Sequence, residues 1–189
     1  MGRKKAVNLT YSSRMSVIAT LNVGRNGATS KNGNSTSLSS PADRSRFLAL
    51  HRSAGSYLVG RNSYRAESYS SAEAPIYILS RRAVPIPNAP ENVRVIAEPT
   101  LVESARAIYR QGPHPIIVEA GVLLLLPLIE SGCIEELELS ISPIDGDDHF
   151  VDVAKLLSYF EIMSDESVAG TRLLKCRYQG DSAYREDNS

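Results

Sequence analysis

The sequence predicts an α/β fold whose central sheet is mostly parallel and ends in antiparallel strands. Short β-branched runs alternate with helical patterns through most of the chain, which favours parallel strands joined by helices. From residue 136 onward the pattern consists mainly of strands. The stretch 115–132 predicts a buried strand, a tight turn through small residues and a helix. The length of 189 residues suits one α/β domain over 15–178, between a flexible basic tail (1–14) and a flexible C-terminal tail (179–189).

Cap and turn signals set the limits of the individual elements. Ser40 before Pro41 predicts a helix N-terminus, and Thr100 with Glu103 predicts a capping box at another. The segment 22–40 is rich in Gly, Asn, Ser and Thr, and we expect a long loop without core residues there. Strands are expected at 15–21, 56–59, 76–79, 93–97, 115–118, 136–142, 156–163 and 171–178, helices at 41–53, 100–110 and 122–131, and turns at 60–63 and 145–148.

The charge distribution leaves two interpretations open. The 21 Lys and Arg side chains balance 21 Asp and Glu, and a net charge of zero argues against a dedicated nucleic-acid binder. Residues 1–42 nevertheless hold six basic side chains and no acid, whereas residues 128–167 hold eleven acids and one base. These regions are either a basic tail and an acidic solvated face, or a basic side that receives an anionic ligand.

Several classes of protein are disfavoured by the sequence. Cys133 and Cys176 are far apart and lack metal-binding spacing, which predicts a reduced, cytoplasmic protein. The three histidines are too scattered for a zinc site, so we expect no bound metal. The longest apolar stretch, around 121–129, is too short to span a bilayer, and no apolar signal core follows the basic N-terminus. We therefore expect a small-molecule ligand rather than a membrane or a nucleic acid.

The turn after the strand at 115–118 is the clearest candidate for a ligand site. Gly121 lacks a Cβ, and the helix after it begins with N–H groups that have no partner in the chain, so the turn suits a phosphate. Glu119 would end a buried strand, where a carboxylate is costly unless it is paired or used. It could hold a substrate amine or hydroxyl, supply a proton, or only accept bonds from nearby backbone N–H groups.

Four segments together resemble a known family in their order and spacing. They are 19–22 (ATLN), 58–67 (LVGRNSYRAE) with the helix 41–52 that leads to it, 117–121 (IVEAG), and 128–137 (LIESGCIEEL) running to Ser142-Pro143. Over residues 15–178 the chain is similar to the C-terminal reductase domain of riboflavin biosynthesis, the 5-amino-6-(5-phosphoribosylamino)uracil reductase. The resemblance implies a dihydrofolate-reductase-like three-layer sandwich. It also implies a homodimeric, NADPH-dependent enzyme that reduces the ribose of a phosphoribosylamino-pyrimidine.

The resemblance also implies where ligands would lie. Arg81 at a strand end could pair with a 2′-phosphate and so favour NADPH over NADH, although Arg81 and Arg82 are equally well explained as a solvated pair. Glu119 is the implied catalytic residue, and the substrate would contact Ser35, His51 and Glu119. The cofactor would contact Ile18, Ser37, Ser63, Glu67, Ser80, Arg81, Gly121, Val122, Leu123 and Leu124.

Three departures from the family pattern concern the substrate. The run 22–24 (NVG) stands where the family usually has Asp-Gly. Without gaps, His51 stands where the family has a phosphate-binding arginine, and Arg52 could replace that arginine only if the register slips by one residue. The short segment 68–73 carries no base where a second arginine is expected. We therefore expect a reductase acting on a small pyrimidine-ribosyl or related carbonyl or imine compound. A catalytically inactive nucleotide-binding or dimerisation module of the same fold is the alternative, and dihydrofolate reduction is a third hypothesis.

Overall fold

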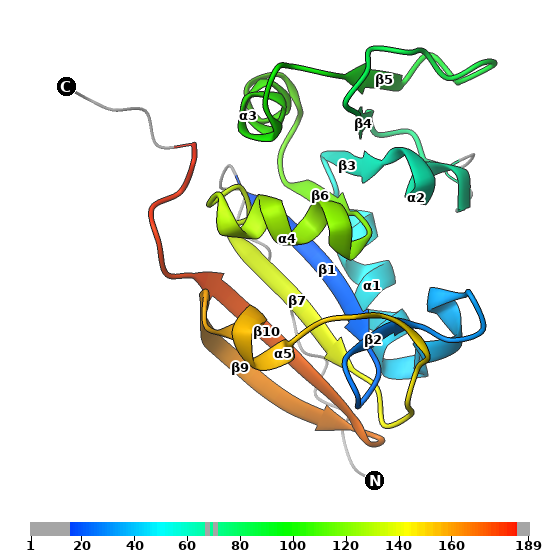
Figure 1. The fold of residues 1–189 in the computed structure, drawn as a ribbon, viewed down its shortest axis with the longest axis vertical. Helices are drawn as coiled ribbons and strands as arrows, with labels where there is room; N and C mark the ends of the chain where they lie inside the picture. Colours follow the sequence, from blue (N-terminus) through cyan, green and yellow to red (C-terminus); the bar gives the residue numbers. More distant parts are fainter. Residues whose placement is uncertain (1–15, 67–68, 70–71, 185–189) are drawn as a thin grey trace, which may run out of the picture.

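The computed structural model describes residues 16–66, 69 and 72–184, in which a large sheet carries helices on both faces (Figure 1). The strands are β1 (Val17–Val23), β2 (Ala28–Ser30), β3 (Ser56–Gly60), β4 (Ile76–Leu79), β5 (Val93–Ile96), β6 (Ile116–Glu119), β7 (Glu136–Ile141), β8 (Asp148–Phe150), β9 (Phe160–Val168) and β10 (Thr171–Tyr178). The helices are α1 (Pro41–Ser53), α2 (Arg61–Ala66), α3 (Leu101–Gln111), α4 (Val122–Glu130), α5 (Val153–Leu157) and the 3₁₀ helix η1 (Ser35–Leu38).

The main sheet has eight strands in the order β5-β4-β3-β6-β1-β7-β10-β9. All pairs from β5 to β7 are parallel, whereas β10 pairs antiparallel with both β7 and β9. β2 and β8 form a separate antiparallel pair. This topology confirms the predicted fold class, a mostly parallel sheet with antiparallel C-terminal strands. Because the central strands are parallel, the carboxyl ends of β1, β3, β4 and β6 meet at one edge.

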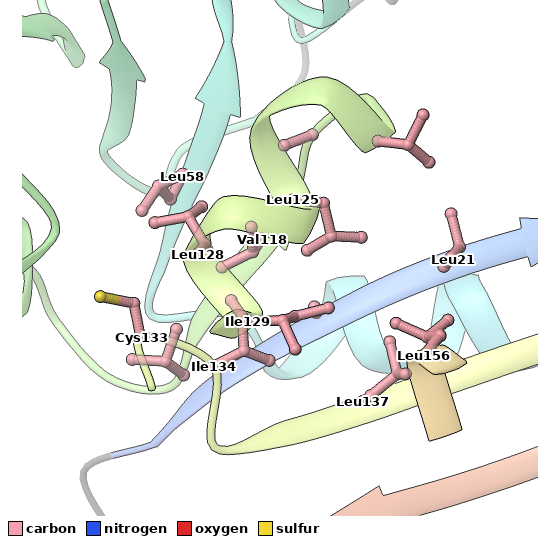
Figure 2. Close-up of a cluster of buried hydrophobic side chains, with 14 of the residues drawn as sticks. Leu21, Leu58, Val118, Leu125, Leu128, Ile129, Cys133, Ile134, Leu137 and Leu156 are labelled. Atoms are coloured by element: carbon pink, nitrogen blue, oxygen red, sulfur yellow. The ribbon is translucent and has the colours of Figure 1, made fainter. Parts of the chain in front are cut away.

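The core lies on both faces of the sheet, as the three-layer prediction requires. On one face, Leu50 of α1 packs with Ile18 and Ile117. On the other face, Leu128 of α4 packs with Val118, the next residue along β6 (Figure 2). Successive residues of a strand point to opposite faces, so a strand covered by helices on both sides reads as a continuous apolar run. This is why 115–118 carried no alternating pattern.

The predicted caps are present and explain where two helices begin. The Ser40 side chain accepts a hydrogen bond from the Asp43 N–H at 3.2 Å, and Pro41 is the first residue of α1. At α3, the Thr100 hydroxyl accepts from the Glu103 N–H at 3.1 Å, and the Glu103 carboxylate accepts from the Thr100 N–H at 3.0 Å. Both capping predictions are confirmed.

The prediction of a core-free loop over residues 22–40 is wrong. This segment contains β2 and η1, and its side chains Ala28 and Leu38 are 0% and 1% exposed. Gly27 has φ +83°, and a Cβ built there would lie 2.4 Å from the Val151 carbonyl oxygen. Only glycine permits this close backbone approach, which draws the polar loop onto the residues after β8. Two isolated apolar side chains in a Gly- and Asn-rich stretch gave no periodic signal.

Three smaller predictions are corrected by short elements. The predicted turn at 60–63 is the start of α2, and the predicted turn at 145–148 ends inside β8. The predicted strand over 156–163 begins only at Phe160, because Asp152 caps the short helix α5 through a 3.0 Å bond from the Lys155 N–H. A one-turn helix is too short to show a helical period, so an apolar pair within it was assigned to the following strand.

The C-terminal segment is packed as far as the structure describes it. The Ala183 N–H donates to the Gly132 carbonyl at 2.9 Å, and the rings of Tyr184 and Tyr109 are stacked with centroids 4.0 Å apart. Residues 179–184 therefore lie against the main domain, while the predicted basic tail 1–14 falls outside the described residues. Within 16–66, 69 and 72–184, none of the helices has the length and apolar character needed to cross a membrane.

Candidate active-site cleft

A cleft of about 1690 Å³ lies where the carboxyl ends of β1, β3, β4 and β6 meet. Small-molecule pockets typically measure about 300–1,000 Å³, so this cleft has room for two ligands side by side. Its walls come from strand ends, the first turns of α2 and α4, one face of α1, and the β2–β8 pair with η1. The location agrees with the rule that open parallel sheets bind ligands beyond the carboxyl ends of their strands.

The turn between β6 and α4 is open toward this cleft. Gly121 is the N-cap of α4, and no side chain caps the helix. A Cβ built on Gly121 meets no atom within 4 Å, so the space beside the backbone is free. The Leu124 and Leu125 N–H groups bond the Gly121 carbonyl, whereas the N–H groups that precede them in a helix have no intrahelical acceptor. An anion can therefore approach the positive end of the helix dipole without displacing a side chain.

Two further strand ends supply hydroxyl and guanidinium groups. Ser63 follows β3 and Ser80 follows β4, and both line the cleft together with Arg81 and Arg82. Arg61 donates a hydrogen bond to the Val84 carbonyl, and this bond holds its side chain against the loop after β4. In the described part of the chain, no ion pair involves Arg81 or Arg82, and both are exposed. These two arginines can meet an anionic group of a ligand.

Glu119 is a buried carboxylate at the carboxyl end of β6, with its side chain 8% exposed. One carboxylate oxygen, Oε1, pairs with His51 Nε2 from α1. The other, Oε2, accepts a hydrogen bond from the Tyr69 hydroxyl at 2.9 Å. Tyr57 lies behind them and donates to the His51 carbonyl at 3.2 Å. Burial, followed by the Glu119 charge, raises the pKa of Tyr57, so its hydroxyl stays protonated.

A second buried ion pair lies on the α1 side of the cleft. Arg46 pairs with Glu138 of β7 at 3.2 Å, with the side chains 13% and 5% exposed. The same guanidinium donates to the Ser140 hydroxyl oxygen at 2.7 Å, and the Ser140 hydroxyl donates to Asp43. This network ties α1 to β7, since a buried charge is tolerated only when its partners are satisfied.

The structure brings most of the predicted site residues to one cleft. His51 lies directly behind Glu119, whereas Ile18 is 2% exposed in the core and Thr20, Leu21 and Asn22 line the cleft in its place. Ser37 belongs to η1 but is absent from the lining, and Glu67 is outside the described residues. The predicted residues that line the cleft are Ser35, Ser63, Ser80, Arg81, Glu119, Gly121, Val122, Leu123 and Leu124.

Sequence reasoning missed the contribution of α1 beyond His51. Asp43, Arg46, Phe47 and Leu50 all line the cleft, and Arg46 and Phe47 each lie three or four residues from both Asp43 and Leu50, which places the four on one helix face. That periodicity was available in the sequence and would have identified the stripe. Tyr69 gave no such signal, because it lies in a loop.

The remaining titratable groups add no metal or thiol chemistry in the described residues. Among residues 16–66, 69 and 72–184, His, Cys, Asp and Glu side chains form no group able to hold a metal ion. Cys133 and Cys176 are buried outside the cleft lining, and burial raises the pKa of each thiol to about 11. A thiol in such surroundings stays protonated and is a poor nucleophile.

Solved structures share this fold at low sequence identity. No protein-family model and no curated protein matches the sequence. A protein from Shewanella sp. PV-4, provisionally assigned to riboflavin biosynthesis, matches with a TM-score of 0.67 at 16% identity, covering 88% of this chain and 100% of that one. The deaminase/5-amino-6-(5-phosphoribosylamino)uracil reductase of Thermotoga maritima matches with a TM-score of 0.63 at 15% identity, over 86% of this chain and 56% of that longer one.

Dihydrofolate reductase from Enterococcus faecalis, complexed with NADP(H) and RAB-propyl, matches with a TM-score of 0.62 at 15% identity. The match covers 88% of this chain and 98% of that protein. The chain therefore has a dihydrofolate-reductase-like fold, and the resemblance to riboflavin pyrimidine reductases inferred from the sequence extends to its three-dimensional structure. At these identities the likeness establishes the fold alone.

Proposed function

We propose that this chain is an NADPH-dependent reductase that transfers a hydride to a small pyrimidine-ribosyl or related carbonyl or imine compound. The observation that carries the proposal is the turn after β6, which presents a different group on each of its two sides. Gly121 leaves open space for a phosphate on one side, and Glu119 presents a confined carboxylate on the other. Both border one cleft with room for a dinucleotide and a second, smaller molecule.

The residues at the Gly121 side fit a dinucleotide. The first two N–H groups of α4, those of Val122 and Leu123, would hold the pyrophosphate beside Leu124, and the Ser63 hydroxyl would bond a phosphate oxygen. Arg81, near Ser80, would pair with the 2′-phosphate that distinguishes NADPH from NADH. When bound, the reduced nicotinamide supplies the hydride, and the protein supplies orientation and electrostatics.

Glu119 would act on the second molecule. Its carboxylate is held in place by His51 and Tyr69 from two different segments, so its position is fixed before a ligand arrives. A fixed carboxylate can orient an N–H or O–H group of the acceptor, or pass a proton to the heteroatom that gains negative charge. The cytoplasmic location and the homodimer implied by the family resemblance are part of this proposal, and light scattering during gel filtration tests the dimer.

The alternative is a catalytically inactive nucleotide-binding or dimerisation module of the same fold. One observation favours it, namely that both oxygens of Glu119 already have partners within the chain. In that case Glu119 would be a structural link between β6 and α1, and the cleft would bind a nucleotide without turnover.

Titration of the purified protein with NADPH and with NADH, followed by cofactor fluorescence, separates these possibilities. The reductase proposal expects saturable NADPH binding at micromolar to low-millimolar concentration and weaker NADH binding. Absence of NADPH binding at millimolar concentration would contradict the reductase proposal. Binding without any NADPH oxidation, in the presence of a panel of pyrimidine carbonyl and imine compounds, would instead support the inactive module.

A further inference from the structure

Aromatic rings wall the part of the cleft that holds Glu119. The ring centroids of Phe47 and His51 lie 4.0 Å apart, those of His51 and Tyr57 5.0 Å, and those of Tyr57 and Tyr69 6.1 Å. Phe47 and Tyr69 belong to the cleft lining, and His51 and Tyr57 support them from behind. We call the lining formed by Phe47, Leu50, Tyr69 and Glu119 the acceptor end. Its apolar surface suits a flat ring.

The basic side chains next to the acceptor end already have partners. His51 pairs with Glu119, and Arg46 pairs with Glu138 while also donating to the Leu174 carbonyl at 3.0 Å. Arg44 is exposed and lies over the Phe47 ring, 5.2 Å from its centroid. A phosphate entering the acceptor end would face the Glu119 carboxylate, and no buried cation there is without a carboxylate partner in the described residues. Burying such an anion is unfavourable.

The hydrogen-bonding capacity of the acceptor end points to a donor-bearing ligand. Each oxygen of an ionised carboxylate has two lone pairs, so Glu119 can accept more bonds than those from His51 and Tyr69. An N–H or O–H group on a ring stacked along Phe47 or Tyr69 could supply the additional donor. Because His51 already pairs with one oxygen of Glu119, the pair offers a ligand hydrogen-bond acceptors rather than a cation, and an uncharged ligand that carries donors is the matching partner.

We propose that the acceptor end takes an uncharged, phosphate-free ring compound that carries N–H or O–H donors, and that His51 sets this selectivity by pairing with Glu119. This rests on the proposed function, in which that compound is the hydride acceptor. His51 is a positioning residue, since it acts on the ligand through Glu119. Glu119 and Tyr69 touch the ligand directly.

Calorimetric titration with two probes tests the proposal, both with saturating NADP⁺ and without it. 5,6-Diaminouracil is a neutral flat ring with N–H donors, and uridine 5′-phosphate carries a related ring with a phosphate. We expect the neutral probe to bind at least tenfold more tightly. Tyr69→Phe and Glu119→Gln should each weaken the neutral probe severalfold or more. Tyr159→Phe, which removes a hydroxyl that bonds Glu130 outside the cleft lining, is the matched control and should change nothing.

The His51→Arg variant distinguishes a role in ligand selectivity from a purely structural role. The quantity measured is the ratio of the affinities for the two probes, which a purely structural role would leave unchanged. An arginine has donors to spare after pairing with Glu119, so the preference for the neutral probe should shrink in this variant. The comparison is between two ligands on one protein, so a general loss of stability cancels.

Three results would overturn the proposal: uridine 5′-phosphate binding more tightly to the native protein, no saturable binding of 5,6-diaminouracil, or an unchanged ratio in His51→Arg. If uridine 5′-phosphate binds and Arg44→Ala abolishes that binding, then Arg44 is an anion site at the acceptor end and the proposal is wrong. Failure of NADPH to bind is a separate outcome. It removes the hydride-transfer role, while the ranking of the two probes without cofactor still decides the chemistry of the acceptor end.

Discussion

His51 of α1 and Glu119 of β6 form an ion pair across the cleft wall, with side chains 23% and 8% exposed. From the sequence, His51 was expected only as a substrate contact, and Glu119 was expected as a carboxylate in need of a partner or a use. The fold makes each the partner of the other. The pair also fixes α1 against the end of β6, so it belongs both to the stability of the domain and to the geometry of the candidate site.

Removal of His51 should therefore destabilise the protein more than removal of both charges. His51→Ala leaves the confined Glu119 carboxylate without its partner, and we expect a loss of about 1–3 kcal/mol, because breaking a buried pair costs more than replacing it. Glu119→Gln combined with His51→Ala should recover part of this loss. Urea unfolding of the two single variants and the double variant gives the coupling free energy. Additive losses would contradict the ion pair.

Gly121 offers a test of cofactor placement in which the fold is held constant. A Cβ at this position meets no atom within 4 Å and the backbone φ is −58°, so Gly121→Ala and Gly121→Val should leave the melting temperature nearly unchanged. Both side chains would project into the space proposed for the pyrophosphate. We expect NADPH affinity to fall stepwise, with valine more harmful than alanine and a loss of tenfold or more. Unaltered affinity in Gly121→Val would place the phosphates elsewhere.

Arg81 should decide between the two nicotinamide cofactors if it meets the 2′-phosphate. Arg81→Ala is expected to weaken NADPH binding about tenfold, since a charge-assisted hydrogen bond contributes about 1.5–3 kcal/mol, and to leave NADH binding unaffected. Arg177→Ala is the matched control, because Arg177 is an exposed arginine of β10 outside the cleft lining. Equal losses for NADPH and NADH, or equal effects of the two substitutions, would show that Arg81 is a solvated side chain.

Two leucines of α4 differ strongly in burial and therefore test how this helix packs on the sheet. Leu128 is 0% exposed in the core of Figure 2, whereas Leu123, five residues earlier on the same helix, is 84% exposed. Leu128→Ala should cost about 2–5 kcal/mol through lost burial and the cavity left behind. Leu123→Ala should change stability by less than about 0.5 kcal/mol. Thermal unfolding of both variants measures the difference, and similar values would contradict the position of α4 on the sheet.

The sequence predicted the large elements because each satisfied several local rules together. The strand at β6, the capped helices α1 and α3, and the closing strand β10 combined apolar runs, caps and turn residues that agreed with one another. The short elements β2, β8, η1, α2 and α5 were missed because each spans too few residues to display a period. In the site, the strand-end residues were found through their turns. Tyr69 and the Arg46–Glu138 pair depend on packing between segments distant in sequence, which no local rule contains.

Glu135 should make stability depend on pH in an unusual direction. Burial is the largest influence on its carboxyl and raises the pKa above its ordinary value, even though the Val17 N–H and the Ser182 hydroxyl donate to the carboxylate. A carboxyl whose pKa is higher in the folded state binds its proton more tightly there. Its contribution to stability is fully present below the unfolded-state pKa and is lost as pH rises through the folded-state pKa.

Glu135→Gln should therefore stabilise the protein at pH 7 relative to the native chain, and the advantage should shrink toward pH 4. Glutamine keeps an oxygen that can accept one of the two hydrogen bonds and never bears the charge that burial disfavours. Glu161→Gln, on the exposed strand β9, is the control and should show no such trend. The measurement is the difference in melting temperature between variant and native protein from pH 4 to pH 8. A constant or inverted difference would mean that the two hydrogen bonds outweigh burial at Glu135.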